Sequence, residues 1–161
     1  MTLNKILKNT LLIISACLLL SACATQKTVT SGSQMQGDVY TGTDTVKELA
    51  PGVPDRVFFA TNESILTTAS RETLRKQAEY LRKNSNMNIV LEGHADERGT
   101  REYNLALGER RANAAKDYLM TYGISASRIS VISYGKERPV DSGSNTLAWS
   151  KNRRSVTVKA N

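Results

Sequence analysis

Short β-rich runs alternate with two long helical patterns between residues 53 and 161, and this order constrains the fold more than any other feature. The two helices are predicted at residues 67–83 and 103–122. The runs rich in β-branched and aromatic residues lie at 56–60, 88–92, 129–133 and 155–159. The resulting order, β-α-β-α-β-β, predicts an α+β fold: a two-layer α/β sandwich in which the helices cover one face of a mixed sheet.

Both predicted helices have recognisable ends and an apolar face. Thr67 or Thr68 is a suitable N-cap for the first helix, and Gly123 is a typical stop for the second. Apolar residues recur at helical spacing, so we expect one face of each helix to be buried. These residues are Leu74, Ala78 and Leu81 in the first helix and Leu107, Ala115, Tyr118 and Leu119 in the second.

The first 22 residues have the pattern of a secretory signal peptide. Two lysines precede an apolar run over residues 11–20. That run is shorter than the ~20 residues that a membrane-spanning helix requires. Residues 20–23, Leu-Ser-Ala-Cys, resemble the bacterial lipobox, in which the cysteine is diacylated and becomes the new N-terminus. We therefore expect cleavage after residue 22 and lipidation at Cys23.

Residues 23–52 are predicted to be a lipidated N-terminus followed by a flexible tether. They are rich in Thr, Ser, Gly and Gln, and their few apolar residues show no sustained periodicity. Residues 53–161 are expected to form the folded domain. Cys17 leaves with the signal peptide and Cys23 carries lipid, so the mature protein has no thiol for a disulfide and depends on its core.

The folded domain is basic. Residues 53–161 carry 18 basic and 12 acidic side chains, a net charge of +6. A basic excess on a compact body favours an anionic partner, such as nucleic acid, a membrane surface or an acidic polymer. The charge does not choose among them, but export excludes nucleic acid as the partner.

The densest polar constellation follows the second predicted strand, where residues 92–100 read Glu-Gly-His-Ala-Asp-Glu-Arg-Gly-Thr. On the next helix, Asn104, Leu107 and Arg111 stand at i, i+3 and i+7, so they share a face that can point toward the loop carrying Asp96. The acid and the guanidinium have two interpretations. One is an ordinary salt bridge or helix cap, which the residues alone favour. The other is a zwitterion receptor, in which Asp96 takes an ammonium and Arg111 a carboxylate.

A metal site and a catalytic site are both poorly supported. His94 is the only histidine, and a metal site built from His94, Asp96 and Glu97 would need three ligands from one tight loop. No serine or cysteine motif accompanies the histidine, and no pair of acids has a hydrolase pattern. We therefore expect no metal, no cofactor and no enzymatic activity.

Three further motifs accompany residues 92–100 in register. They are Asn-Leu-Ala-Leu-Gly-Glu-Arg-Arg-Ala at 104–112, Ser-Tyr-Gly-Lys-Glu-Arg-Pro at 133–139 and Ser-Lys-Asn-Arg-Arg at 150–154. Together with the lipobox and the tether, they closely resemble the peptidoglycan-associated lipoproteins, the lipidated branch of the OmpA-like peptidoglycan-binding domain family. The resemblance covers roughly residues 55–159.

The resemblance implies a binding pocket for diaminopimelate, the zwitterionic residue of the peptidoglycan stem peptide. Asp96 and Arg111 fall on the two family positions that grip its amino-carboxylate end. Asn104 and Leu107 match further pocket positions, and Arg98 matches a flanking one. The family's turn after the first strand is usually acidic, whereas this chain has Ala-Thr-Asn at 60–62. Backbone N–H groups of Thr61 and Asn62 remain able to hold a carboxylate there.

The resemblance also implies a location and partners. Ala24 follows the lipidated cysteine, which favours the outer membrane over inner-membrane retention. The family tethers the outer membrane to peptidoglycan and works with TolB and the other Tol proteins during envelope constriction at division. The alternative from another class is an envelope enzyme that modifies the cell wall with the same pocket.

Overall fold

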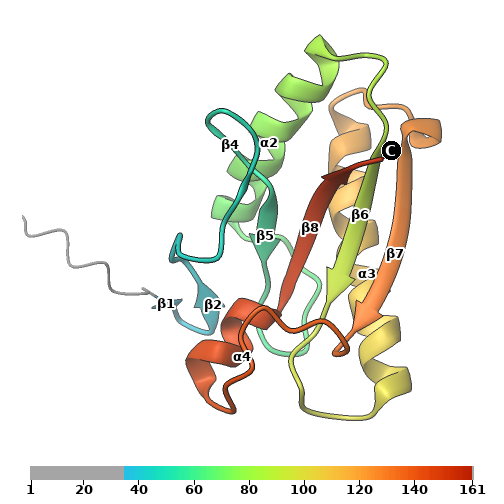
Figure 1. Cartoon of the computed structure of the whole chain (residues 1–161). Helices are drawn as coiled ribbons and strands as arrows, with labels where there is room; N and C mark the ends of the chain where they lie inside the picture. Colours follow the sequence, from blue (N-terminus) through green and yellow to red (C-terminus); the bar gives the residue numbers. More distant parts are fainter. Residues whose placement is uncertain (1–34, 161) are drawn as a thin grey trace, which may run out of the picture. The chain divides into compact units, whose positions relative to one another are not determined.

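A four-stranded mixed sheet backed by two long helices forms the body of the protein (Figure 1). The computed structural model describes residues 35–160. The strand order is β5-β8-β6-β7, where β6 and β7 run parallel and β8 is antiparallel to both β5 and β6. The strands are β5 (Arg56–Phe58), β6 (Ile89–His94), β7 (Ile129–Gly135) and β8 (Arg154–Lys159). The prediction of a mixed sheet with helices on one face is confirmed.

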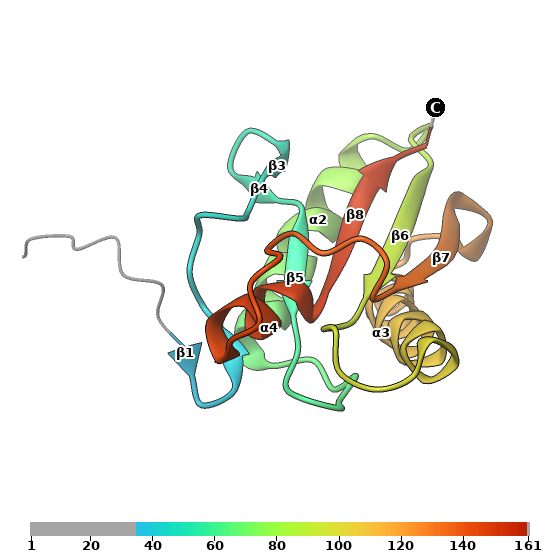
Figure 2. The same cartoon turned by 60° about the horizontal axis from the view of Figure 1, so that its bottom comes forward.

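The two helices lie on the same face of the sheet (Figures 1 and 2). They are α2 (Thr68–Lys83) and α3 (Arg101–Thr121). Thr67 and Thr100 cap them, and each hydroxyl oxygen accepts a hydrogen bond from the backbone N–H three residues later. Gly123 has a φ of 82° just beyond α3, so it takes the left-handed conformation that ends many helices.

The hydrophobic core fills the space between the helices and the sheet. The predicted faces of both helices contribute to it, except that Tyr118 is only partly buried and Leu107 is buried at the polar pocket instead. The buried members are Val57, Phe59, Leu74, Ala78, Leu81, Ile89, Leu91, Ala112, Ala115, Leu119, Ile124 and Ile129. Strands β5, β6 and β7 each contribute residues to this core, so the loops that follow them begin from packed positions.

Two glycines let α3 approach β6 closely. A Cβ atom at Gly93 would lie 1.8 Å from the carbonyl oxygen of Gly108, and one at Gly108 would lie 2.3 Å from Oγ of Ser133. Real atoms do not approach so closely, so neither position accommodates a side chain without a shift of the helix. The contact therefore fixes the distance between α3 and the loop that follows β6.

A third helix, α4 (Thr146–Asn152), was not predicted from the sequence. It has only seven residues, too few for a clear apolar period. Its N-cap is Asn145, whose side-chain oxygen accepts a 3.0 Å hydrogen bond from the backbone N–H of Ala148. Arg153 lies between this helix and β8, and it donates to Asp96 in the loop after β6 at 3.3 Å.

Residues 35–54 require a correction, because the sequence placed most of them in a flexible tether. They form two short antiparallel hairpins: β1 (Met35–Gln36) with β2 (Val39–Tyr40), and β3 (Glu48–Ala50) with β4 (Val53–Pro54). Tyr40 is 2% exposed and meets the ring of Phe58 edge-on at 4.8 Å. Leu49 is also buried. Each hairpin is held by one buried residue, Tyr40 or Leu49. Strands of two or three residues are too short to show a periodic pattern, so the sequence does not predict them.

The predicted signal peptide, the lipidation residue Cys23 and the first part of the predicted tether lie outside the described residues. Among residues 35–160, no helix is long and apolar enough to cross a membrane.

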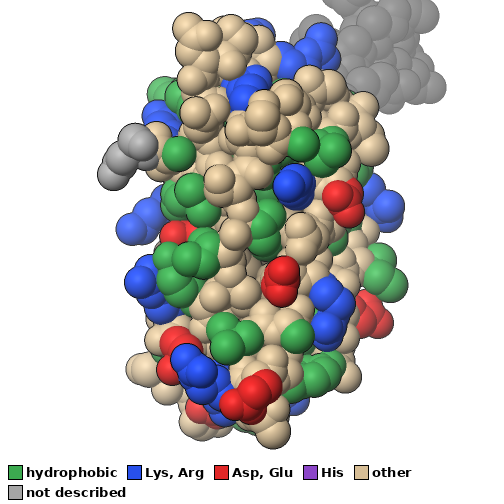
Figure 3. Space-filling view, turned by 90° about the vertical axis from the view of Figure 1, so that its right-hand side faces the viewer, with side chains coloured by type: hydrophobic (Ala, Val, Ile, Leu, Met, Phe, Trp, Pro, Cys, Tyr) green, Lys and Arg blue, Asp and Glu red, His purple; other side chains and the backbone are tan. Residues whose placement is uncertain are grey.

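The surface on the β7 side of the molecule mixes charges of both signs with small apolar groups (Figure 3). The basic excess of the domain is therefore not gathered into one patch on that face. Several of its arginines are instead buried, among them Arg56, Arg111, Arg153 and Arg154.

Candidate ligand-binding site

A polar pocket of about 240 Å³ lies where three segments meet. Its lining comes from the turn after β5, the loop after β6 and the first two turns of α3. The lining residues are Thr61, Asn62, Asp96, Arg98, Gly99, Tyr103, Asn104 and Leu107. Six of the seven residues predicted for the ligand site line it, and only Arg111 does not.

A larger hollow of about 590 Å³ lies between β2, β5 and the start of α2. Its described lining is made of apolar, hydroxyl and arginine side chains and includes no acid. It offers no carboxylate to an ammonium group, so the polar pocket is the better candidate for a zwitterionic ligand.

Asp96 is the only carboxylate in the lining of the polar pocket, and arginines surround it. Its side chain is 8% exposed. Its Oδ2 accepts from Arg98 Nη2 at 2.7 Å and from Arg153 Nη1 at 3.3 Å, and its Oδ1 accepts from Arg98 N and Nε at 3.1 Å. Burial by itself raises the pKa of Asp96, but hydrogen bonds from Arg98 outweigh it and lower the pKa below its ordinary value. The carboxylate is therefore ionised at neutral pH.

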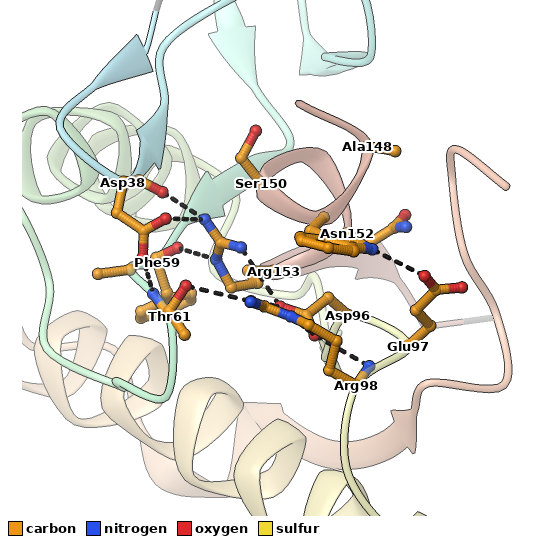
Figure 4. Close-up of polar contacts among 12 residues, drawn as sticks. Asp38, Phe59, Thr61, Asp96, Glu97, Arg98, Ala148, Ser150, Asn152 and Arg153 are labelled. Carbon is orange, nitrogen blue, oxygen red and sulfur yellow. Dashed lines mark hydrogen bonds and ion pairs between the residues drawn. The ribbon is translucent and has the colours of Figure 1, made fainter. Parts of the chain in front are cut away.

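Arg153 connects the pocket to the N-terminal segment (Figure 4). It is 1% exposed and donates to Phe59 O, to the side chain and carbonyl of Asp38, and to Asp96. One buried guanidinium thus holds two carboxylates, Asp38 and Asp96, that are 58 positions apart in sequence.

Arg98 forms the outer wall of the pocket. Its side chain is 43% exposed, it lies 4.3 Å from the ring centre of Trp149, and its Nη2 donates to Thr61 Oγ1 at 3.2 Å. Trp149 is held in turn by Glu97, which accepts from the indole N–H at 2.8 Å. Because it is partly exposed, Arg98 is the arginine of the site that can move with the least disturbance.

Arg111 lies behind the pocket rather than in its wall, which corrects the expectation that it faces Asp96. It is 0% exposed, and its guanidinium donates to the backbone carbonyls of Ala60, Glu63 and His94 at 2.8 to 3.0 Å. Burial, with the nearby positive charge of Arg153, lowers its pKa to about 10, so it stays charged. Three of its five N–H donors are used, and they join the turn after β5 to the end of β6.

Asn104, Leu107 and Arg111 share one buried face of α3, as their spacing predicted, although Arg111 does not face Asp96. All three are buried on the face of α3 that meets the loop after β6. Asn104 donates from Nδ2 to Arg98 O at 2.8 Å, which fixes the backbone of that loop. Leu107 supplies an apolar patch of the pocket floor.

The turn after β5 is held in a specific conformation. Asn62 has a φ of 63°, the one described residue other than glycine with a positive φ. Its side-chain oxygen accepts from the hydroxyl of Tyr103, across the mouth of the pocket. The backbone N–H of Thr61 donates to Asp38 Oδ2, so one of the two backbone donors expected for a ligand carboxylate is already engaged.

Comparison with known proteins agrees with this architecture. Residues 58–153 match the model of the OmpA family, which covers more than half of the chain. The chain is 43% identical over 145 residues to the peptidoglycan-associated lipoprotein of Mesorhizobium japonicum, covering 89% of this chain and 86% of that one. The chain belongs to the OmpA family.

Solved structures of other proteins share the fold. The peptidoglycan-associated lipoprotein of Burkholderia pseudomallei is 35% identical, with a TM-score of 0.64 over 66% of this chain and 90% of that one. The C-terminal domain of Helicobacter pylori MotB has a TM-score of 0.62 at 19% identity, over 66% of this chain and 84% of that one. The MotB likeness shows the fold alone, whereas the lipoprotein matches confirm the resemblance read from the motifs.

In this OmpA-family chain, the His94 side chain lies on the face of the sheet opposite the hydrophobic core. It stacks on Tyr134 at 5.5 Å between ring centres, and its two ring nitrogens have no hydrogen-bond partner among the described residues. Burial, together with Arg154, Arg56 and Arg138, lowers its pKa to about 3, so it is neutral. In the described part of the chain, no three His, Cys, Asp or Glu side chains are placed to hold a metal ion.

Several residues of the site were not identified from the sequence. Gly99 and Tyr103 adjoin predicted site residues, and Tyr103 stands four positions before Leu107 on the same face of α3. Arg153 lies in one of the family motifs but had no role assigned. Asp38 lies in a segment without periodicity, and only the fold brings it to the pocket.

Proposed function

We propose that this chain is an outer-membrane lipoprotein whose folded domain binds peptidoglycan non-covalently through the diaminopimelate of the stem peptide. The observation that carries the proposal is the pocket lining: an ionised, largely buried Asp96 beside cationic and amide groups. The names of the relatives support the same reading, since they are peptidoglycan-associated lipoproteins.

The chemistry suits a free amino-carboxylate group. Asp96 provides the negative charge for an ammonium, and backbone N–H groups of the turn after β5, which Arg111 holds from behind the pocket, provide donors for a carboxylate. Both oxygens of Asp96 are occupied by Arg98 and Arg153, so we expect Arg98 to move when the ligand enters. A ligand that lacks either charge leaves one of these groups unpaired and binds weakly.

The site serves attachment rather than catalysis in this proposal. Each small contact is of moderate strength, but many chains anchored in one membrane and facing one polymer gain from multivalency. Lipid at Cys23 would hold each chain in the outer membrane, since several acyl chains give stable anchoring. The resemblance adds TolB and the other Tol proteins as partners and envelope constriction at cell division as the process.

Sedimentation with purified peptidoglycan tests the proposal. We expect the chain to sediment with peptidoglycan, free diaminopimelate-containing stem peptide to release it, and no soluble fragments to appear. Asp96→Asn should weaken binding by at least about 30-fold, because it removes one partner of a buried charge-assisted contact. Asp141→Asn is the matched control, since it removes the same charge from an acid outside the pocket.

Two outcomes would overturn this function. Full binding by Asp96→Asn would exclude the pocket as the binding site. Release of soluble wall fragments by the purified chain would instead support the alternative, an enzyme that modifies the cell wall.

A further inference from the structure

The carboxylate of Asp38 bridges two hydrogen-bond donors at the edge of the pocket (Figure 4). It belongs to the turn between β1 and β2, far from the pocket in sequence. Its Oδ2 accepts from the backbone N–H of Thr61 at 2.5 Å, and its Oδ1 accepts from Arg153 Nη2 at 2.8 Å. Thr61 lines the pocket, and Arg153 also holds Asp96.

These two donors are of the kind that binds a ligand carboxylate. A backbone N–H in a turn and a guanidinium are the usual partners of such a group. The positive charges of Arg153 and Arg98 attract the Asp38 carboxylate as they would attract a carboxylate from outside. Asp38 thus presents, from within the chain, the same chemical group that the proposed ligand carries.

A ligand carboxylate can replace Asp38 more easily than Asp96, because Asp38 is the more exposed of the two acids that Arg153 binds. The Asp38 side chain is 41% exposed, whereas the Asp96 side chain is 8% exposed. Strands β1 and β2 have two residues each, and the buried anchor of this hairpin is Tyr40 at the end of β2, two positions after Asp38. The turn can therefore leave the pocket edge while the four-stranded sheet stays intact.

We infer that Asp38 is an internal competitor for the ligand carboxylate, so that the β1–β2 turn holds the pocket edge until a ligand displaces it. This inference rests on the proposed function and adds a control of the same site. Ligand binding releases Thr61 N–H and Arg153 from Asp38 and frees the turn. The apparent association constant of the chain is then its intrinsic value multiplied by the fraction of molecules in which Asp38 has released these donors.

The test compares the full chain, purified in detergent micelles, with Asp38→Ala and Asp38→Asn. Asp38→Ala should bind a diaminopimelate-containing stem peptide about threefold to tenfold more tightly, the range expected from loss of a partly exposed competing contact. The affinity of Asp38→Asn should lie between that of the unchanged chain and that of Asp38→Ala, because its amide oxygen still accepts a hydrogen bond from the Thr61 N–H. Glu48→Gln, which removes the same charge from an exposed position of β3, should bind like the unchanged chain.

Hydrogen exchange gives a readout that does not depend on affinity. Addition of the stem peptide should accelerate amide exchange in residues 35–40 of the unchanged chain, which contain β1 and β2. Unchanged or slower exchange there would contradict displacement of the turn.

The outcomes separate the two proposals. Failure of the unchanged chain to bind the stem peptide refutes the proposed function and, with it, this inference. If the unchanged chain binds but Asp38→Ala binds equally or more weakly, only the competitor role is refuted, and weaker binding makes Asp38 part of the receptor. If Asp38→Ala does not fold, the same comparison with Asp38→Asn decides.

Discussion

Arg111 has a structural role that a binding assay alone would not reveal. Its guanidinium joins three backbone carbonyls, those of Ala60, Glu63 and His94, from two segments that contribute to the pocket. Arg111→Ala leaves those carbonyls without a donor, so we expect the free energy of unfolding to fall by about 3 kcal/mol or more. Arg111→Lys should also destabilise the fold, because one ammonium cannot replace a planar fork. Urea unfolding measures both, with the exposed Arg82→Ala as the control.

If Arg111→Ala kept the stability of the unchanged chain, the three carbonyl contacts would not matter to the fold. Loss of binding in that case would mark Arg111 as a ligand-contacting residue alone. Asp96 gives the cleaner binding test of the two, because it lines the pocket.

His94 predicts a pH dependence of stability. Its pKa is lowered to about 3 in the fold, whereas an unfolded histidine titrates near 6.5. The unfolded chain therefore takes up a proton below about pH 6.5 that the folded chain does not, and stability falls as the pH decreases from 6.5 toward 3. The slope from this group is at most about 1.4 kcal/mol per pH unit.

Chemical unfolding between pH 6.5 and 5 measures this slope. The carboxyl groups with lowered pKa values, such as Asp96, lose their stabilising effect at lower pH, below about pH 4. His94→Phe, which keeps a ring against Tyr134, should remove the slope whatever its overall stability. The same slope in both proteins would show that His94 is protonated or accessible in the fold.

At the scale of single elements, the contact between α3 and β6 depends on glycine. Gly93→Ala would put a methyl group 1.8 Å from the Gly108 carbonyl oxygen, so we expect a loss of about 3 kcal/mol or more. Gly123→Ala has free space but a positive φ, and it should cost only about 1 kcal/mol. Thermal melting compares the stability of the two variants. An equal loss of stability in both would mean that α3 can shift away from β6 at little cost.

The N-terminal hairpins behave as part of the folded unit. Replacing residues 37–50 with Gly and Ser removes Tyr40 and Leu49, each buried. Full burial of such side chains contributes about 1.5–3 kcal/mol each, so the melting temperature should drop. The same replacement over residues 24–34 is the control and should leave the melting temperature unchanged. Equal melting temperatures in the unchanged chain and both variants would mean that residues 37–50 belong to the flexible tether and not to the folded domain.

At the scale of the whole molecule, attachment and binding are separable. Cys23→Ser removes the proposed lipid anchor, so we expect the protein to leave the outer-membrane fraction while it keeps its affinity for peptidoglycan. Membrane fractionation with carbonate washing and peptidoglycan sedimentation measure the two properties. Unchanged recovery in washed outer membranes would exclude Cys23 as the anchor.

The sequence by itself determined the sheet, the two long helices and most of the pocket lining. Periods of two and 3.6 residues report burial within one element, and caps such as Thr67 mark helix ends locally. The motif after β6 and the spacing of Asn104 and Leu107 place side chains by short-range geometry. The resemblance to a known family then assigned those positions a ligand.

Only the tertiary structure decided which charges pair. Asp96 binds Arg98 and the distant Arg153, and Arg111 binds backbone carbonyls instead of Asp96. Asp38 reaches the pocket although it lies in a segment that carries no periodic signal. The physical reason is that a salt bridge requires only that two groups meet in space. The packing of α4, β8 and the N-terminal hairpin brings them together, and no local pattern in the sequence records that meeting.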